Sequence, residues 1–310
     1  MRERWQRGVP PLSPGAEAVA AMVREAVPGA RVAGFAALDG GLLNTNLRVD
    51  LEGGRVLLRL YQHDPAQAGK EAAIARRLHG LVPVPRYLHL GMRDGQRFAV
   101  LEWVAGEPLH RVLEDAEARV ALGRETGAVL ARIHGVHFAQ SGFLDARLEI
   151  VRPFVADKAF LVDYLRGSLV EGGGARFVPR ELVDAVMAYA ERYGDLAWGG
   201  PHCLVHSDFN GTNILVRDGR IVGVLDWEFA FAGPPSADFG NLMRNHPHED
   251  FLGAVEAGYR DSGGHLPGNW RRLAGVTDLI AWADMLQRPR VDPAVVEDAL
   301  RSMRETVSAR

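Results

Sequence analysis

The chain has 310 residues, of which 47% are hydrophobic, and a formal net charge of −3 at pH 7. A chain of this length can bury a substantial core, and its length suggests about two domains or lobes. The slight negative charge and a pI near 6.4 argue against nucleic acid or an anionic membrane as the main partner.

The single cysteine, Cys203, excludes an internal disulfide and a zinc site built from cysteines. Charges in residues 1–15 are not followed by an apolar stretch, so the sequence predicts no signal peptide. No segment approaches the roughly 18 consecutive apolar residues that a membrane-spanning helix needs. We therefore expect a reduced, cytoplasmic protein.

The first third of the chain predicts a sheet. Residues 1–14 form an irregular arm, because its prolines oppose regular structure. Apolar residues at helical spacing predict a helix over residues 17–27, and β-branched and apolar runs predict strands over 32–38, 47–51 and 56–61.

A glycine-rich turn joins the first two of these strands, with the sequence DGGLLNTN over residues 39–46. Its glycines, Gly41 among them, could bring backbone N–H groups close to a phosphate, with Asn44 beside them. The turn matches no established phosphate-binding pattern and has no Walker lysine, so an ordinary hairpin turn is the alternative.

Arg59 is a cation inside the apolar strand VLLRL. After it, Asp64-Pro65 predicts a helix start, with Asp64 as N-cap, and the helix extends to about His79. Glu71 lies on the apolar face of this helix and has no cationic partner three or four residues away. Because an unpaired buried carboxylate is costly, we expect Glu71 to pair with Arg59.

Two further strands, over 86–92 and 97–104, form a hairpin around Asp94-Gly95 and lead into a break at 105–109. The rest of the chain is mainly helical. Helical spacing predicts helices over residues 120–136, 154–169, 179–193, 251–259, 270–286 and 293–307. The chain is therefore expected to be an α+β protein with its sheet in the N-terminal part.

The segment 204–240 interrupts the helices with a second hairpin. Two β-branched runs, 214–216 and 221–225, flank Asp218-Gly219, the preferred pair for a tight hairpin turn. Closing this hairpin places Asn213, before the first strand, beside Asp226, after the second. Asp208 is a short loop away, so two carboxylates and one amide carbonyl should converge there.

Oxygen ligands of this kind suit Mg²⁺, which uses one or two carboxylates together with substrate phosphates. The order His206-x-Asp208-x-x-x-x-Asn213, followed by Asp226, is also the order of catalytic and metal-binding residues in kinases. The alternative is that these residues only form turns and caps, because Asp and Asn side chains often bond to nearby backbone groups.

The segments HSDFNGTNIL and VLDWEFAFAGPPSADFGNL resemble the aminoglycoside phosphotransferase and choline kinase family. The resemblance covers most of the chain and implies a two-lobed protein-kinase-like fold. Residues 1–105 would form an N-terminal nucleotide-binding lobe with an antiparallel sheet. Residues 106–310 would form a mainly helical C-terminal lobe for catalysis and substrate binding.

By this resemblance Asp208 is the catalytic base, Asn213 and Asp226 hold Mg²⁺, and His206 is a structural residue of the loop. Asp238 is similar to an aspartate that braces this loop in the family, although it could equally be the N-cap of a helix starting near residue 239.

The resemblance extends to the nucleotide site. The turn with Gly41 and Asn44 is similar to the family's glycine-rich flap, and AVLEWVAGEPL resembles its interlobe hinge. An adenine would then bond to the Glu102 carbonyl and the Val104 amide. Arg59 and Glu71 would correspond to the Lys–Glu pair of protein kinases. Arginine departs from that pattern, which leaves the phosphate geometry open.

We therefore expect a kinase that transfers the γ-phosphoryl group of ATP or GTP to a hydroxyl of a small molecule such as an antibiotic, with Mg²⁺. A choline, amino-alcohol or sugar kinase is the alternative, and a nucleotide-binding regulatory module without catalysis is a further one. A protein kinase is disfavoured because Ser207 replaces the usual arginine and no Ala-Pro-Glu segment follows. The sequence does not indicate the oligomeric state.

Overall fold

A computed structural model describes the chain except residues 1–8, 39–42, 156, 199, 246–247 and 309–310. Its N-terminal lobe is a five-stranded antiparallel sheet with the strand order β1-β2-β3-β5-β4. The strands are β1 (Val32–Ala37), β2 (Thr45–Leu51), β3 (Gly54–Leu60), β4 (Tyr87–Arg93) and β5 (Gln96–Glu102). The predicted strands are thus present, each within a few residues of its expected bounds.

Helices α1 (Ala16–Ala26) and α2 (Gln67–Leu78) contact opposite faces of this sheet. Helix α1 packs on Leu58 and Leu60, whereas Ala68 of α2 packs with Tyr61. Successive side chains of a strand point to opposite faces. Arg59, between Leu58 and Leu60, therefore points to the α2 face of the sheet.

The start of α2 differs from the sequence prediction. The helix begins at Gln67, three residues after the predicted N-cap Asp64, and Ala66 occupies the N-cap position without a side-chain bond. The Asp64 carboxylate instead accepts hydrogen bonds from the Ala66 N–H (3.0 Å) and the Gln67 amide (2.6 Å). Asp64 thus stabilises a turn ahead of the helix, a local alternative that Asp side chains often offer.

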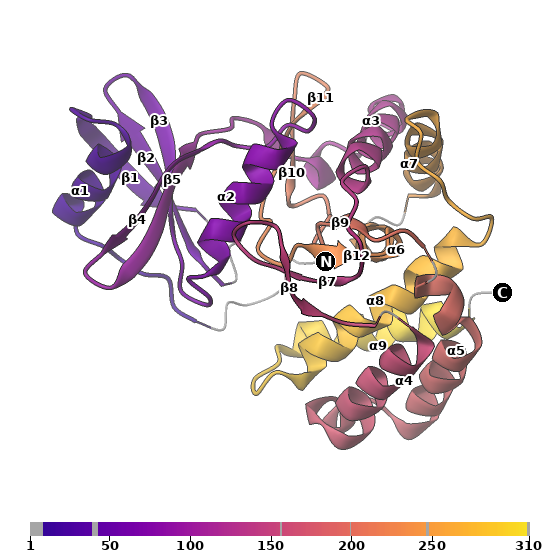
Figure 1. Ribbon diagram of the computed structural model, residues 1–310. Helices are drawn as coiled ribbons and strands as arrows, with labels where there is room; N and C mark the ends of the chain where they lie inside the picture. The colour runs from indigo at the N-terminus through magenta and orange to yellow at the C-terminus, as the bar shows by residue number, and fades with distance from the viewer. Residues whose placement is uncertain (1–8, 39–42, 156, 199, 246–247, 309–310) are drawn as a thin grey trace.

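The C-terminal part is mainly helical, and Figure 1 shows α4, α5, α8 and α9 as a bundle on the side away from the N-terminal sheet. Its helices are α3 (Ala116–His134), α4 (Lys158–Arg166), α5 (Arg180–Trp198), α6 (Ser236–Asn245), α7 (Glu249–Asp261), α8 (Trp270–Gln287) and α9 (Pro293–Ser308). Short turns of 3₁₀ or π helix cover Leu109–Arg111, Gly167–Glu171 and Gly173–Arg176.

Two small sheets are set among these helices, with strand orders β11-β10-β6 and β8-β7-β12-β9. Their strands are β6 (Glu107–Pro108), β7 (Gly142–Leu144), β8 (Ile150–Pro153), β9 (Cys203–Val205), β10 (Ile214–Arg217), β11 (Arg220–Val224) and β12 (Phe231–Gly233). Because β8 extends to Pro153, the helix predicted from residue 154 begins only at Lys158, where Asp157 caps it.

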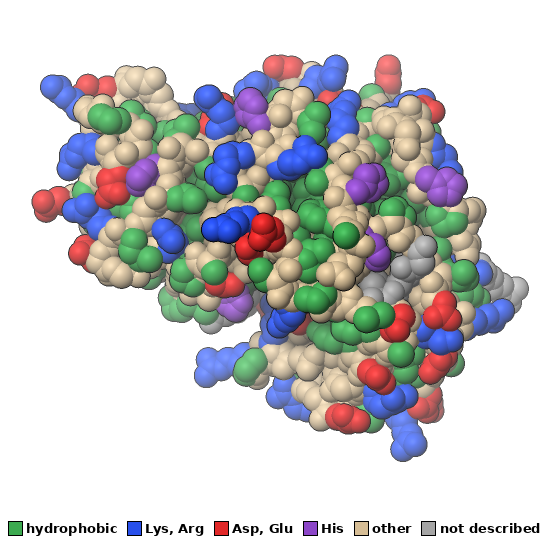
Figure 2. All heavy atoms as spheres, in the orientation of Figure 1, with side chains coloured by type: hydrophobic (Ala, Val, Ile, Leu, Met, Phe, Trp, Pro, Cys, Tyr) green, Lys and Arg blue, Asp and Glu red, His purple; other side chains and the backbone are tan. Residues whose placement is uncertain are grey.

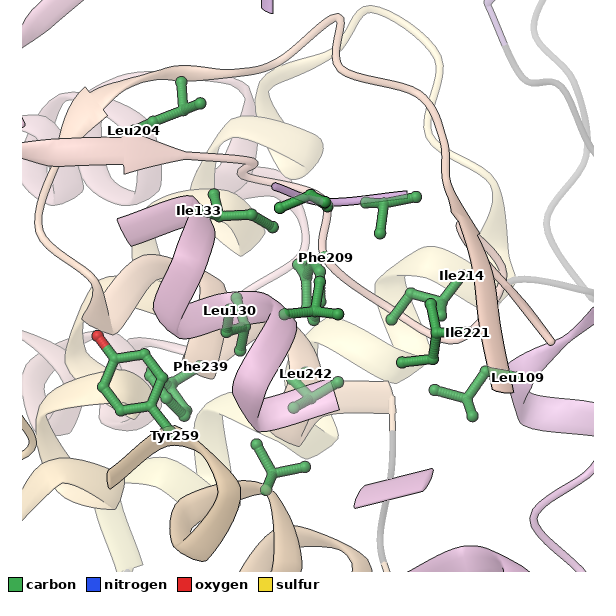
Figure 3. Packing of buried hydrophobic residues seen from close by; sticks show 14 of the residues in the cluster. Leu109, Leu130, Ile133, Leu204, Phe209, Ile214, Ile221, Phe239, Leu242 and Tyr259 are labelled. Carbon is green, nitrogen blue, oxygen red and sulfur yellow. The ribbon is translucent and has the colours of Figure 1, made fainter. Parts of the chain in front are cut away.

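One hydrophobic core joins the two lobes. Ile74 and Leu78 of α2 belong to the same buried cluster as Leu130 of α3 and Ile214 of β10. Figure 3 shows Leu130 and Ile133 of α3 beside Phe209, with Ile214 and Ile221 of the hairpin in the same cluster. A second core fills the bundle of α4, α5, α8 and α9. Phe209 and the β10–β11 hairpin are therefore anchored in this core by packed side chains.

Cys203 is fully buried in β9, as its apolar surroundings predict. Among the described residues, no helix is both long and apolar enough to cross a bilayer. On the face drawn in Figure 2, side chains of both charge signs are interspersed.

Candidate active site

The hairpin predicted around Asp218-Gly219 is present. Strands β10 and β11 pair antiparallel, and Asp218 (φ 53°) and Gly219 (φ 70°) both adopt the left-handed conformation of a type I′ turn. At the open end of the hairpin, the Leu225 N–H donates to the Asn213 carbonyl at 2.8 Å. Asn213 and Asp226 are thereby held next to each other, as the sequence predicts.

The carboxylate of Asp208 is fixed from two sides. Its Oδ1 accepts a hydrogen bond from Asn210 Nδ2 at 3.0 Å, and its Oδ2 accepts one from Asn213 Nδ2 at 2.8 Å. Asn213 Nδ2 also donates to the Asp208 backbone carbonyl at 2.9 Å. With its nitrogen turned to Asp208, the Asn213 amide directs its oxygen away from that residue.

Asp238 braces the loop that carries Asp208. It is completely buried, and its two carboxylate oxygens accept the N–H groups of Ser207 (2.7 Å) and His206 (2.9 Å). His134 Nε2 lies 3.1 Å from the same carboxylate. Helix α6 already begins at Ser236, so the N-cap reading of Asp238 is wrong. Its bonds hold Ser207 at φ 67°, a conformation that non-glycine residues rarely adopt.

His206 connects this loop to the end of the hairpin. Its Nε2 donates to the Leu225 carbonyl at 2.8 Å, and its Nδ1 accepts the Asp208 N–H at 3.2 Å. Asp226, directly after Leu225, also has a positive φ of 66°. Both segments that carry the predicted catalytic and metal-binding carboxylates are therefore held in unusual backbone conformations, which are typical of functional sites.

Arg59 lies at the centre of three carboxylates. Its Nη2 is 2.7 Å from Asp226 Oδ1 and 3.5 Å from both Glu71 Oε1 and Glu228 Oε2. The expected contact between Arg59 and Glu71 is thus present, and Asp226 binds the same nitrogen more closely. Burial acts to lower the pKa of Arg59, but Glu71 and Asp226 outweigh burial and hold it well above its ordinary value.

The cluster around Arg59 is mostly buried, with Asp226 partly exposed, and it holds three carboxylates for one guanidinium. Glu71 also accepts hydrogen bonds from the hydroxyls of Tyr87 (2.6 Å) and Tyr61 (3.3 Å), and burial raises its pKa although Arg59 opposes the shift. Burial and the neighbouring Asp226 raise the pKa of Glu228 to about 8. A cluster of this composition favours the arrival of a cation.

Three residues of the site, Glu228, Lys70 and Asn210, are not predicted from the sequence. The ammonium of Lys70, on α2, donates to the carbonyls of Glu228 (2.8 Å) and Ala230 (2.9 Å), and burial lowers its pKa to about 8. It therefore ties α2 to the segment after Asp226. The signals were present: a second acid lies two residues after Asp226, and a lysine directly precedes Glu71.

The remaining residues that are predicted to bind the nucleotide differ in their surroundings. Asn44 Nδ2 donates to Glu228 Oε2 at 2.6 Å, so Asn44 belongs to the cluster, whereas Gly41 lies outside the described residues. Glu102 ends β5 and pairs with Arg86 at 3.0 Å. The side chain of Val104 lies against Gly223 of the hairpin. Glu102 and Val104 thus lie where the sheet meets the C-terminal part of the chain.

A family model described as the phosphotransferase enzyme family matches residues 34–276, which begin within β1 and include β2 to β5, α2, the loop with Asp208 and the β10–β11 hairpin. The chain belongs to the phosphotransferase enzyme family. This phosphotransferase shares the family's kinase-like fold, with an antiparallel sheet lobe and a helical C-terminal part.

Solved structures agree with this fold. The GDP complex of a variant of aminoglycoside 2′-phosphotransferase IIIa is 18% identical, with a TM-score of 0.75, and the match covers 95% of this chain and 98% of that one. Macrolide 2′-phosphotransferase MphH from Brachybacterium faecium is 21% identical, with a TM-score of 0.68 and coverages of 92% and 97%. At such identities the likeness shows the fold of this phosphotransferase.

Proposed function

We propose that this phosphotransferase transfers the γ-phosphoryl group of ATP or GTP to a hydroxyl of a small molecule. The single observation that carries the proposal is the fixed carboxylate of Asp208. Asn210 and Asn213 hold its two oxygens, and Asp238 braces the loop beneath it. A carboxylate in this position can orient an acceptor hydroxyl and accept its proton.

In the proposed step, the acceptor oxygen forms a bond to the γ-phosphorus as the bond from that phosphorus to the β,γ-bridging oxygen breaks. The hydroxyl proton passes to Asp208, and the nucleoside diphosphate leaves with the bond electrons. Fixed geometry supplies most of the acceleration in such a transfer, because little covalent chemistry is left to the protein. The rigid hydrogen bonds around Asp208 serve this purpose.

The residues present fit Mg²⁺. Asn213 turns its amide oxygen away from Asp208, and Asp226 lies next to Asn213, so the available donors are oxygens, as this ion prefers. Asn213 and Asp226 would hold the ion, which would neutralise charge on the phosphates. Arg59 now bonds to Asp226 and is the cation of this chain that would face the phosphate groups.

The nucleotide would enter between the two lobes, whose boundary we place near residue 105. Asn44, at the end of the glycine-rich turn with Gly41, would lie over the phosphates, and Glu71 would hold Arg59 in position. The Glu102 carbonyl and the Val104 amide would bind the adenine or guanine ring. Related structures support a nucleotide donor of either kind, since one contains AMP-PNP and others contain GDP.

We propose a hydroxylated antibiotic as the acceptor. The support is the range of acceptors among similar proteins: one structure contains hygromycin B, one contains kanamycin, and one is a macrolide phosphotransferase. The reaction would take place in the cytoplasm, a reducing compartment that would keep the single cysteine as a thiol.

The test is a screen for ATP and GTP consumption with Mg²⁺, using aminoglycosides, macrolides, amino alcohols and sugars as acceptors. Asp208→Asn serves as the blank, because the amide keeps the shape of the side chain and one of its two acceptor oxygens but cannot accept the proton. We expect turnover to disappear in this variant while nucleotide affinity stays within about threefold, since Asp208 contacts the acceptor.

An amino alcohol or sugar as the only accepted class would replace the antibiotic proposal by the alternative kinases. Nucleotide binding without consumption for any acceptor would indicate a regulatory module. Full activity of Asp208→Asn would overturn the assignment of the base.

A further inference from the structure

A groove of about 610 Å³ lies along the first half of α8, between α6 and α9. None of the residues proposed for the active site lines it. Figure 1 shows α8 and α9 within the helical bundle, with the N-terminal sheet at the other end of the molecule. The groove therefore lies outside the set of residues proposed for phosphoryl transfer.

Arg244 lines this groove from α6. Its side chain is only 3% exposed, and its guanidinium lies over the ring of Trp282, 4.8 Å from the ring centroid. Within the described chain, its Nε and Nη1 have no hydrogen-bond partner. A buried guanidinium with unsatisfied N–H groups is unfavourable, because these donors have lost water without a replacement.

Asp278 neutralises Arg244 only in part. Its Oδ1 lies 3.4 Å from Arg244 Nε, which is an ion-pair distance without hydrogen-bond geometry. A second guanidinium, that of Arg272, also lines the groove and leaves its Nε without a hydrogen-bond partner in the described part of the chain. Two arginines that line the groove thus have N–H groups without a hydrogen-bond partner in the described part of the chain.

The other acidic residues of the groove do not bind these free N–H groups. Glu256 binds Arg260 of its own helix at 2.9 Å, and Glu305 is exposed on α9. The start of α8 opens into the same groove, with Asn269 as an N-cap that makes no side-chain bond and no acidic residue in the first turn. The positive end of a helix adds to the attraction for an anion.

We propose that this groove binds a small oxyanion, a phosphate or carboxylate group, with Arg244 as its principal ligand. The planar guanidinium matches the two oxygens of such a group, and a ligand oxygen would satisfy the Nη1 donor that the protein leaves unpaired. Arg272 and the first turn of α8 supply further positive charge. The Trp282 ring below Arg244 holds the guanidinium in place.

The site is connected to the catalytic loop through α6. The helix that carries Arg244 also carries Asp238 and Asn241, and Asn241 Nδ2 donates to the Ser207 carbonyl at 3.1 Å. An anion that orders Arg244 therefore stabilises the helix that braces this loop. The binding itself does not depend on the proposed phosphoryl transfer.

The experiment titrates inorganic phosphate and, separately, acetate into the full chain without metal or nucleotide, by calorimetry. Hydrogen exchange locates the site: phosphate should slow amide exchange in residues 240–245 and 268–278. Arg244→Lys should weaken binding about tenfold or more, because lysine lacks the planar fork. Ser302→Asp should also weaken it, since it adds a negative charge at the groove without removing a buried group.

Arg288→Gln is the matched control. It removes an arginine at the opposite end of α8, where Arg288 forms an exposed pair with Asp284 at 3.7 Å outside the groove. Binding in this variant should equal that of the parent protein. Phosphate binding without acetate binding, or the reverse, would tell which oxyanion the site prefers.

Absence of binding for both anions would overturn the proposal. So would slowed exchange in residues 203–213 and not in α6 and α8, since the anion would then occupy the catalytic segment. Neither result bears on the Asp208→Asn test, so the two proposals can fail separately.

Discussion

The most unusual single residue is Arg59, because one guanidinium faces the carboxylates of Asp226, Glu71 and Glu228 within 3.5 Å. The sequence predicts the contact with Glu71, since a carboxylate on a packing face needs a cation from elsewhere. The sequence does not predict that Glu228 is a third carboxylate near Arg59, because the position of Glu228 depends on how the chain turns after Asp226. Each carboxylate here raises the proton affinity of the others.

Glu228→Gln should change how stability depends on pH. In the folded protein the pKa of Glu228 is raised to about 8, from an ordinary value of 4.5. Between these values the folded state holds a proton that the unfolded chain has released, so rising pH destabilises the fold. Glutamine removes this titration. The free energy of unfolding of the variant should therefore increase relative to that of the parent as pH rises from 5 to 8.5, by an amount on the order of 1–3 kcal/mol, and its Tm should rise relative to that of the parent.

Thermal unfolding of both proteins as a function of pH, with a chelator present and no nucleotide, measures this difference in pH dependence. Glu52→Gln, which removes a mostly exposed carboxylate paired with Arg31, is the control and should give no comparable pH trend. A difference between Glu228→Gln and the parent that stays constant across this pH range would show that Glu228 does not titrate there.

At the scale of elements, local sequence predicts the sheet and the hairpins well, because their signals are short-range. The Asp218-Gly219 pair fixes the turn, and alternation along β3 places Arg59 on the α2 face. Helix starts are predicted less well. At Gln67 and Lys158 the helix begins later than expected, because an Asp-stabilised turn and strand β8 compete for the preceding residues.

Gly219→Ala should destabilise the protein by about 1–2 kcal/mol, because Gly219 has φ 70°, where a Cβ clashes with the backbone. The matched control is Gly53→Ala in the β2–β3 turn, where a Cβ meets no atom within 4 Å and φ is not in the left-handed range. Chemical denaturation measures both. Equal effects of the two substitutions would mean that the type I′ turn does not determine the hairpin.

At the scale of the whole molecule, the two lobes share structure that sequence patterns cannot reveal. Leu78 and Ile74 of the N-terminal lobe are buried in the core that also holds the β10–β11 hairpin. In addition, the Val224 N–H of β11 donates to the Pro83 carbonyl at 2.7 Å. These contacts join residues far apart in the chain, so only the folded structure identifies them.

Leu78→Ala should therefore destabilise both lobes together, by about 2–5 kcal/mol, as expected for a fully buried leucine. Calorimetry should show a single transition that moves to lower temperature, and far-UV and near-UV circular dichroism should coincide. The exposed Leu88→Ala, in β4, is the control and should change Tm little. Two separate transitions would show that the lobes unfold independently.

The burial of Cys203 makes this thiol a natural probe. It lies in β9, directly before the catalytic loop, its Sγ contacts the Gly233 carbonyl at 3.4 Å, and burial raises its pKa well above the ordinary value. An exposed thiolate attacks alkylating reagents, whereas a buried thiol does not. Their reaction with the only thiol of the chain should thus proceed only when β9 separates from its neighbours. The rate of alkylation would therefore report how often β9 opens, at the strand directly before the loop that carries Asp208, and no engineered label is needed.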